Sequence, residues 1–127
     1  MNKVKTRTAN IFLDDNKILH IEIIDGVNID YEDAIDNHLV CKNLSNNQKV
    51  LKLLDSRVKW SIDKKAETFA ESKEVEEKTR ARAIIVGSTI QSVLSNFFNR
   101  LNKPNVPTMV FSDYDEAYQW LVSFKNA

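Results

Sequence analysis

Residues 80–104 combine a short apolar run with an amphipathic helical pattern. The run Ala83–Val86 has no polar position on either face, as in a central strand that is covered on both sides. The segment 88–104 then repeats apolar residues at spacings of three and four, which predicts a helix with one buried face. A strand buried on both faces needs helices on both sides of its sheet, so we expect a layered α/β domain.

The remaining segments continue this alternation of strand and helix. Residues 9–25 show a hairpin pattern, with apolar residues alternating on both sides of a turn-forming stretch at 14–17. Strands are then expected over 49–55, 80–87 and 106–111, and helices over 30–45, 61–79, 88–104 and 112–126. The segment 61–79 is expected to be broken, with Ser72 as the cap of a separate second turn. The expected order is β-β-α-β-α-β-α-β-α, which gives a mostly parallel sheet with an antiparallel edge hairpin and packed helices.

Length, charge and composition argue against several classes of protein. The 127 residues suit one domain over 1–127, and 43% of them are apolar, which is enough for a core. Lys and Arg number 18, as do Asp and Glu, so no basic surplus indicates nucleic-acid binding. No apolar stretch approaches the ~20 residues of a membrane span, and the N-terminus lacks the apolar region of a secretory signal. A single cysteine, Cys41, suits a reducing compartment, so we expect a cytoplasmic protein.

No catalytic or metal-binding constellation is evident. His38 and Cys41 lie three residues apart on a predicted helix, where a surface histidine beside a half-buried cysteine is the favoured interpretation. Two histidines and one cysteine have no recognisable metal-ligand spacing. His20 is predicted on the strand face opposite the apolar residues, and Asp14 in a solvated turn. We therefore expect no catalytic residue, no metal and no cofactor; the weaker alternative is an enzyme that a cofactor or partner completes.

The order of elements resembles the STAS-like fold of the bacterial anti-sigma-factor antagonists and their relatives. The C-terminal sequence NFFNRLNKPNVPTMVFSDYDEAYQWL, at 96–121, is similar to that of small uncharacterised bacterial STAS-like proteins. This resemblance covers most of the chain as topology and implies a regulatory module that acts through protein contacts.

The same resemblance draws attention to the sequence LLDSRVKWSIDKKAE at 53–67. In anti-sigma-factor antagonists the loop after this strand carries a DSSG-like motif, whose serine is phosphorylated by a partner kinase. Asp55 matches the aspartate at the strand end, but the later DSSG is absent from this chain. Ser61 is the nearest hydroxyl, and its favoured role is to cap the next helix. The sequence therefore lacks the motif of the conventional phosphoserine switch.

The first functional hypothesis is a non-catalytic interaction module that binds an unknown regulatory protein. Its expected contact surface is the rim that follows the second strand region, formed by Asp55, Ser56, Arg57, Trp60 and Ser61. Asp55 and Arg57 are expected to pair with each other or with neighbouring loops. For Trp60, packing in the core is favoured over a place in the contact surface.

The second hypothesis is a protein that binds a small ligand such as a nucleotide, an anion or a lipid. Gly87, Ser88 and Thr89 follow a central strand, where the carboxyl ends of parallel strands commonly bind ligands, and would act together with Asp55 and Arg57. The competing interpretation of this segment is helix capping alone, through a capping box that joins Ser88 to Gln91.

Two adjacent phenylalanines give the most specific packing prediction. Phe97 and at least one of Val93, Leu94 and Leu101 should be buried against the sheet, because they share the apolar stripe of one helix. Phe98 should lie at the edge of that stripe, either under a neighbouring helix or in a homodimer contact.

Overall fold

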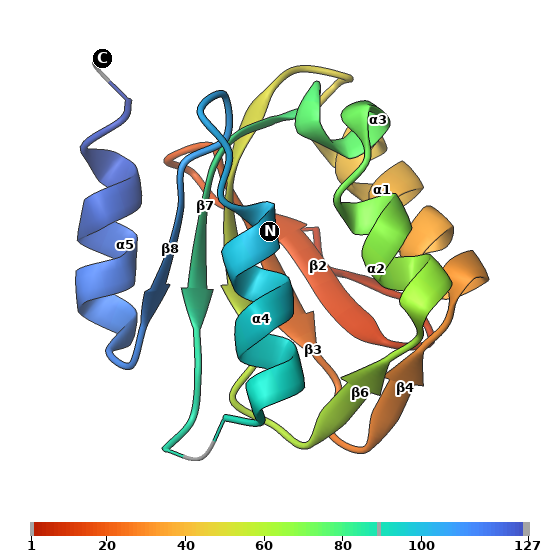
Figure 1. Cartoon of the computed structure of the whole chain (residues 1–127). Helices are drawn as coiled ribbons and strands as arrows, with labels where there is room; N and C mark the ends of the chain where they lie inside the picture. Colours follow the sequence, from red (N-terminus) through yellow and green to blue (C-terminus); the bar gives the residue numbers. More distant parts are fainter. Residues whose placement is uncertain (1, 89, 126–127) are drawn as a thin grey trace.

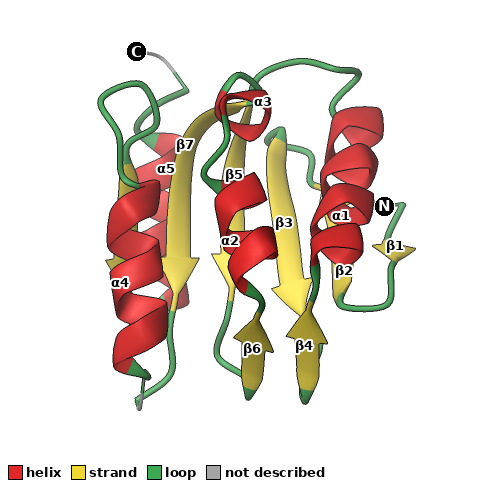
Figure 2. Cartoon of the chain, turned by 45° about the vertical axis from the view of Figure 1, so that its right-hand side comes forward, coloured by secondary structure: helices red, strands yellow, loops and turns green. Residues whose placement is uncertain are grey.

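The computed structural model describes residues 2–88 and 90–125 and has a six-stranded sheet with helices on both faces. Figure 2 shows α1, α2 and α4 in front of this sheet and α5 behind it. The main-sheet strands are β1 (Val4–Lys5), β2 (Ala9–Leu13), β3 (Ile18–Ile23), β5 (Val50–Asp55), β7 (Thr79–Ile85) and β8 (Thr108–Phe111). The helices are α1 (Tyr31–Leu44), α2 (Lys64–Ala70), α3 (Lys73–Glu76), α4 (Ser92–Leu101) and α5 (Tyr114–Val122).

The topology confirms the predicted mostly parallel sheet with an antiparallel edge. The strand order is β1-β2-β3-β5-β7-β8, in which β1, β2 and β3 pair antiparallel and β3, β5, β7 and β8 pair parallel. The sequence did not indicate three short strands. One is β1, which extends the antiparallel edge. The other two, β4 (Val27–Ile29) and β6 (Trp60–Ile62), form a separate parallel pair. This pair lies beyond the ends of β3 and β5 (Figure 1).

β7 is the central strand that the apolar run predicts. It lies between β5 and β8, and it is buried along almost its whole length. Ala81, Ala83 and Ile85 pack in one cluster with Ala117 and Leu121 of α5. Ile84, on the opposite face, packs in a second cluster that includes the buried face of α4. Both faces of β7 are therefore covered, as expected from a strand with no polar face.

The helix predicted from residue 88 begins later than expected. α4 begins at Ser92, and its N-cap residue Gln91 has an extended backbone and makes no side-chain capping bond. The predicted capping box of Ser88 and Gln91 is therefore wrong. The predicted helix began too early because Ile90 fits the apolar spacing of the helix, although it packs against the core from the non-helical segment before α4.

The apolar stripe of α4 is confirmed, with one correction. Leu94, Phe97 and Leu101 are buried, whereas Val93 is 56% exposed. Phe98 does not lie at the edge of the stripe, because it is only 1% exposed and its ring stacks on Trp60 at 6.2 Å between ring centroids. A side chain this deeply buried within one chain cannot form a homodimer contact, so that alternative for Phe98 is also wrong.

A capping box closes the start of α1. The backbone N–H of Asp33 donates to Asp30 Oδ1 at 2.8 Å, and the N–H of Asp30 donates to Asp33 Oδ2 at 2.9 Å. Asp33 also accepts hydrogen bonds from the Arg7 guanidinium, which holds the pKa of Asp33 at about 2. The cap thus joins α1 to the segment before β2.

Replacing Asp30 with alanine should lower the free energy of unfolding by about 1 kcal/mol, because an N–H group of the first turn loses its acceptor. Urea denaturation measures this change. Asp36→Ala is the matched control, since Asp36 is an exposed aspartate on the same helix. An equal loss of stability in both variants would show that the cap contributes nothing specific.

Candidate functional site

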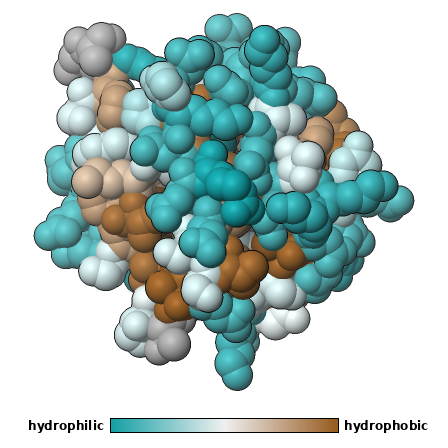
Figure 3. Space-filling model, in the orientation of Figure 1, coloured by the Kyte–Doolittle hydropathy of each residue, from teal (hydrophilic) through white to brown (hydrophobic). Residues whose placement is uncertain are grey.

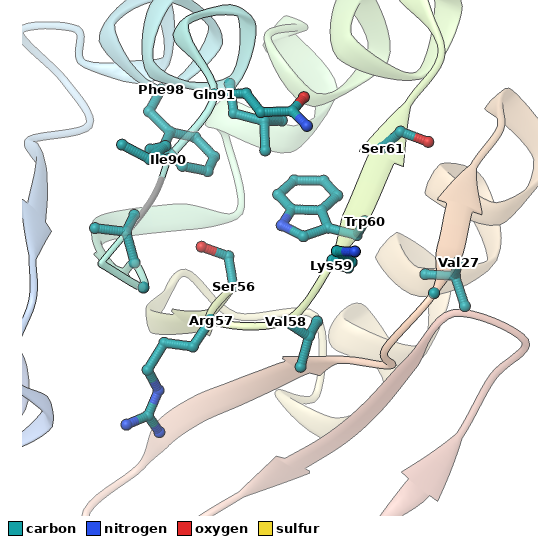
Figure 4. A pocket seen from close by; sticks show the side chains of 14 residues that line it. Val27, Ser56, Arg57, Val58, Lys59, Trp60, Ser61, Ile90, Gln91 and Phe98 are labelled. Carbon is teal, nitrogen blue, oxygen red and sulfur yellow. The ribbon is translucent and has the colours of Figure 1, made fainter.

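A cleft opens at the carboxyl ends of β3, β5 and β7, and we call it the strand-end cleft (Figure 4). Its volume is about 390 Å³. The lining residues come from the segments after the three strands, which include β4 and β6, and from α4: Gly26, Val27, Ser56, Arg57, Val58, Lys59, Trp60, Ser61, Val86, Gly87, Ile90, Gln91, Leu94 and Phe98. In an α/β sheet this is the position where ligands commonly bind.

Ser56 and Gly87 hold the two central loops of the cleft together. Ser56 is buried, and both its backbone N–H and its Oγ donate to the carbonyl oxygen of Ile85, at 2.9 and 2.8 Å. A Cβ at Gly87 would lie 3.4 Å from the Arg57 carbonyl oxygen, which shows how closely the two loops approach each other. Ser56 and Gly87, which the sequence assigned to two different hypotheses, both line this cleft.

Asp55 and Arg57 form the pair that the sequence predicts. Arg57 donates from Nε to Asp55 Oδ1 at 2.9 Å and from Nη2 to Asp55 Oδ2 at 2.7 Å. Burial alone would raise the pKa of Asp55, but the hydrogen bonds from Arg57 bring it below its ordinary value. Arg57 lines the cleft and Asp55 does not, so the aspartate acts by fixing the direction of the guanidinium.

Trp60 is packed in the core, as favoured from the sequence. Figure 4 shows its indole projecting from β6 toward the side of the cleft where Ile90 and Phe98 lie. The same side chain also lines a second cavity, which lies behind it under α1 and α2. Trp60 is therefore a wall between two cavities, and it contributes no exposed aromatic patch.

The other sequence-predicted site residues separate into two groups. Ser61 lies at the cleft, but on β6, where its Oγ donates to Asn28 Oδ1 at 2.7 Å. The predicted capping role of Ser61 is wrong, because Asp63 occupies the N-cap position of α2. Ser88 is exposed and does not line the cleft, and Thr89 lies outside the described residues.

Both histidines are buried, which corrects the predicted surface position of His38. His38 faces the core from α1, where the Phe69 ring meets it edge-on at 5.6 Å between centroids. Burial, together with nearby lysines, lowers the pKa of His38 to about 4. His20 does lie on the opposite strand face, but α5 covers that face and Asp14 Oδ2 is 2.9 Å from His20 Nε2. Asp14 is also not solvated as predicted, since it accepts a hydrogen bond from Tyr118 at 2.7 Å.

The second cavity, which we call the inner cavity, was missed by sequence reasoning. It has a volume of about 140 Å³ and lies between the sheet and the helices α1 and α2. Lys52 of β5 and Arg82 of β7 reach it from the sheet, and His38 and Cys41 reach it from α1. The available signal was a basic residue between apolar neighbours in each of two strands: Lys52 within VLKLL, and Arg82 within ARAII.

The arrangement of strands and helices is a SpoIIAA-like, or STAS-like, fold. The crystal structure of an uncharacterised DUF3478-family protein with a SpoIIAA-like fold, from Shewanella loihica PV-4, is similar to this chain with a TM-score of 0.61. The two share 13% sequence identity, and the alignment covers 94% of this chain and 90% of the other. This similarity confirms the predicted STAS-like fold.

The family itself is shown by the sequence. The family model of DUF7793, a domain of unknown function, matches residues 11–125, so the chain belongs to the DUF7793 family. No curated protein matches the sequence. Within residues 2–88 and 90–125, no helix is both long enough and apolar enough to cross a membrane.

Proposed function

We propose that this protein is a non-catalytic regulatory module that recognises a partner protein at the strand-end cleft. The observation that carries the proposal is a cleft of about 390 Å³ at the strand ends, which mixes apolar walls with two basic side chains. A SpoIIAA-like fold in a solved structure of 13% identity supports the same general architecture. No histidine, cysteine or carboxylate is among the described lining residues, so the proposal includes no catalytic step.

The charge of the cleft favours one kind of partner. Arg57 and Lys59 are its only charged described lining residues, and both are basic and exposed. Val58, between them, is an exposed apolar residue. On the face shown in Figure 3, apolar surface gathers around α4 within a mostly hydrophilic surrounding. A partner segment that places an acidic residue beside an apolar one would complement this surface.

Selection of a random peptide library on the protein should therefore enrich peptides with an acidic residue next to an apolar one. Lys59→Glu should weaken the selected peptides at least about tenfold, because it reverses the charge that faces the acidic residue. Lys49→Glu is the matched control: Lys49 is exposed and precedes β5, so it lies at the opposite end of that strand. Equal peptide binding by the wild type and Lys59→Glu would contradict the proposal. Capture of the same partner protein from the native host by both the wild type and Lys59→Glu, in equal amounts, would also contradict it.

A small ligand at the same cleft is the second candidate function. The volume of the cleft lies within the range of roughly 300–1,000 Å³ that is typical of ligand sites. A thermal-shift screen of nucleotides, anions and lipids tests this alternative, since a ligand at 100 times its dissociation constant adds about 2.7 kcal/mol. Stabilisation that Lys59→Glu abolishes would favour the ligand, and no stabilisation by any class would reject it.

A further inference from the structure

We propose that the inner cavity binds a small organic carboxylate with an apolar body, and that Lys52 holds its carboxylate. This site is separate from the strand-end cleft. It does not depend on what binds there, because Trp60 is the one described residue that lines both cavities.

The sheet places two cations side by side in the floor of the inner cavity. Lys52 and Arg82 are partners in the parallel pairing of β5 and β7, so their side chains point to the same face. That face is the one covered by α1 and α2, and Lys52 and Arg82 are only 4% and 8% exposed. Arg82 donates from Nη1 to Thr108 Oγ1 at 3.2 Å.

Lys52 has no counter-ion among the described residues. Lys52 has no hydrogen bond or ion pair to any residue within 2–88 and 90–125, and no Asp or Glu is among the described lining residues. An unpaired buried cation is costly, and proteins normally avoid the cost by pairing the charge. Burial, together with the neighbouring Arg82, lowers the pKa of Lys52 to about 8, so most of it stays protonated at pH 7. An anionic ligand would supply the missing partner.

His38 offers a further unused donor. Neither of its ring nitrogens has a hydrogen-bond partner among the described residues, and Glu74 is 3.8 Å from its Nε2, beyond hydrogen-bond distance. The low pKa of His38 keeps the ring neutral, so one nitrogen carries a hydrogen that it can donate. His38 lines the same cavity as Lys52, so its ring is a second candidate donor to a ligand carboxylate there.

The size and lining of the cavity define the remainder of the ligand. Its volume of about 140 Å³ is close to that of an engineered protein cavity of roughly 150 Å³ that binds benzene. Most of the lining is apolar and comes from α2 and the strands beside it, including Ile21, Ile62 and Phe69. Benzoate and hexanoate are therefore suitable probes, whereas inorganic phosphate has no apolar body to bury.

Binding should be measured by calorimetry and by the fluorescence of Trp60. The second tryptophan, Trp120, lies on α5 on the other side of the sheet, so a Trp120→Phe background isolates the signal of Trp60. We expect benzoate or hexanoate to bind and to change this fluorescence. Benzyl alcohol, hexanol and inorganic phosphate should bind at least tenfold more weakly. Lys52→Met should abolish carboxylate binding while the protein stays folded, because methionine fills a similar volume.

Lys59→Met is the matched control, since it removes a lysine from the strand-end cleft. It should leave carboxylate binding unchanged. The proposal would be overturned if neither carboxylate binds at concentrations up to about 10 mM, since a specific site should have a dissociation constant below that. It would also be overturned if the alcohols bind as tightly as the carboxylates. A third contrary result would be carboxylate binding that is lost in Lys59→Met but kept in Lys52→Met.

Discussion

Replacing Lys52 with methionine should stabilise the ligand-free protein by about 3 kcal/mol at pH 7. The pKa of this lysine falls from 10.5 in the unfolded chain to about 8 in the fold, chiefly through burial. Each unit of such a difference corresponds to 1.36 kcal/mol between the charged and neutral forms. Methionine removes the buried charge and keeps most of the side-chain volume.

The pH dependence of this effect has a definite direction. Above pH 10.5 the lysine is neutral in both states, so its charge costs the fold nothing. As the pH falls from 10.5 to about 8, the unfolded chain takes up the proton first, and the penalty grows until it is complete below about 8. Urea denaturation of the wild type and Lys52→Met should therefore diverge over this window. His38, Cys41 and Arg82 are the titratable groups that line the same cavity as Lys52, and all three residues are present in both proteins.

Lys49→Met is the control for this comparison, because the exposed Lys49 has no buried charge to remove. It should change stability by less than about 0.5 kcal/mol. A Lys52→Met protein that is less stable than the wild type at pH 7 would mean that the ammonium has a favourable partner in the fold. A buried charge that lowers the stability of the fold, as expected for Lys52, is typical of a residue that is retained for binding.

The positions of α4 and β7 could be predicted because each has a clear local pattern. Residues 92–101 repeat apolar side chains over the whole of α4, and Ala83–Val86 lacks a polar face. The strands β4 and β6 were missed because three residues are too short to show a period. They form only because β6 follows the end of β5 and lies beside β4.

The site was harder to predict than the fold. The sequence correctly placed Ser56, Arg57 and Gly87 at one edge of the sheet, since residues that follow parallel strands meet there. Alternation gives no such guide for Lys52. A lysine inside a strand normally faces solvent, and only the positions of α1 and α2 bury this one. Long-range packing of this kind leaves no local signal.

Phe98→Ala should destabilise the protein by about 3–5 kcal/mol, the range for removing a large buried aromatic side chain. Phe98 is buried in the same cluster as Phe97, and its ring supports the indole of Trp60. Denaturant unfolding at several protein concentrations measures the loss. The effect should not depend on concentration, because the contacts of Phe98 lie within one chain. Phe97→Ala should have a cost in the same range.

Val93→Ala is the internal control on the same helix. Val93 is exposed one turn before Phe97, so its removal should change stability by less than about 0.5 kcal/mol. Phe98→Ala should also leave Trp60 more exposed to water, because Phe98 and Trp60 both line the strand-end cleft. In the Trp120→Phe background, the emission of Trp60 should shift to longer wavelength in the folded Phe98→Ala protein. An unchanged emission, or a loss of stability that grows on dilution, would contradict the position of Phe98 between the core and the cleft.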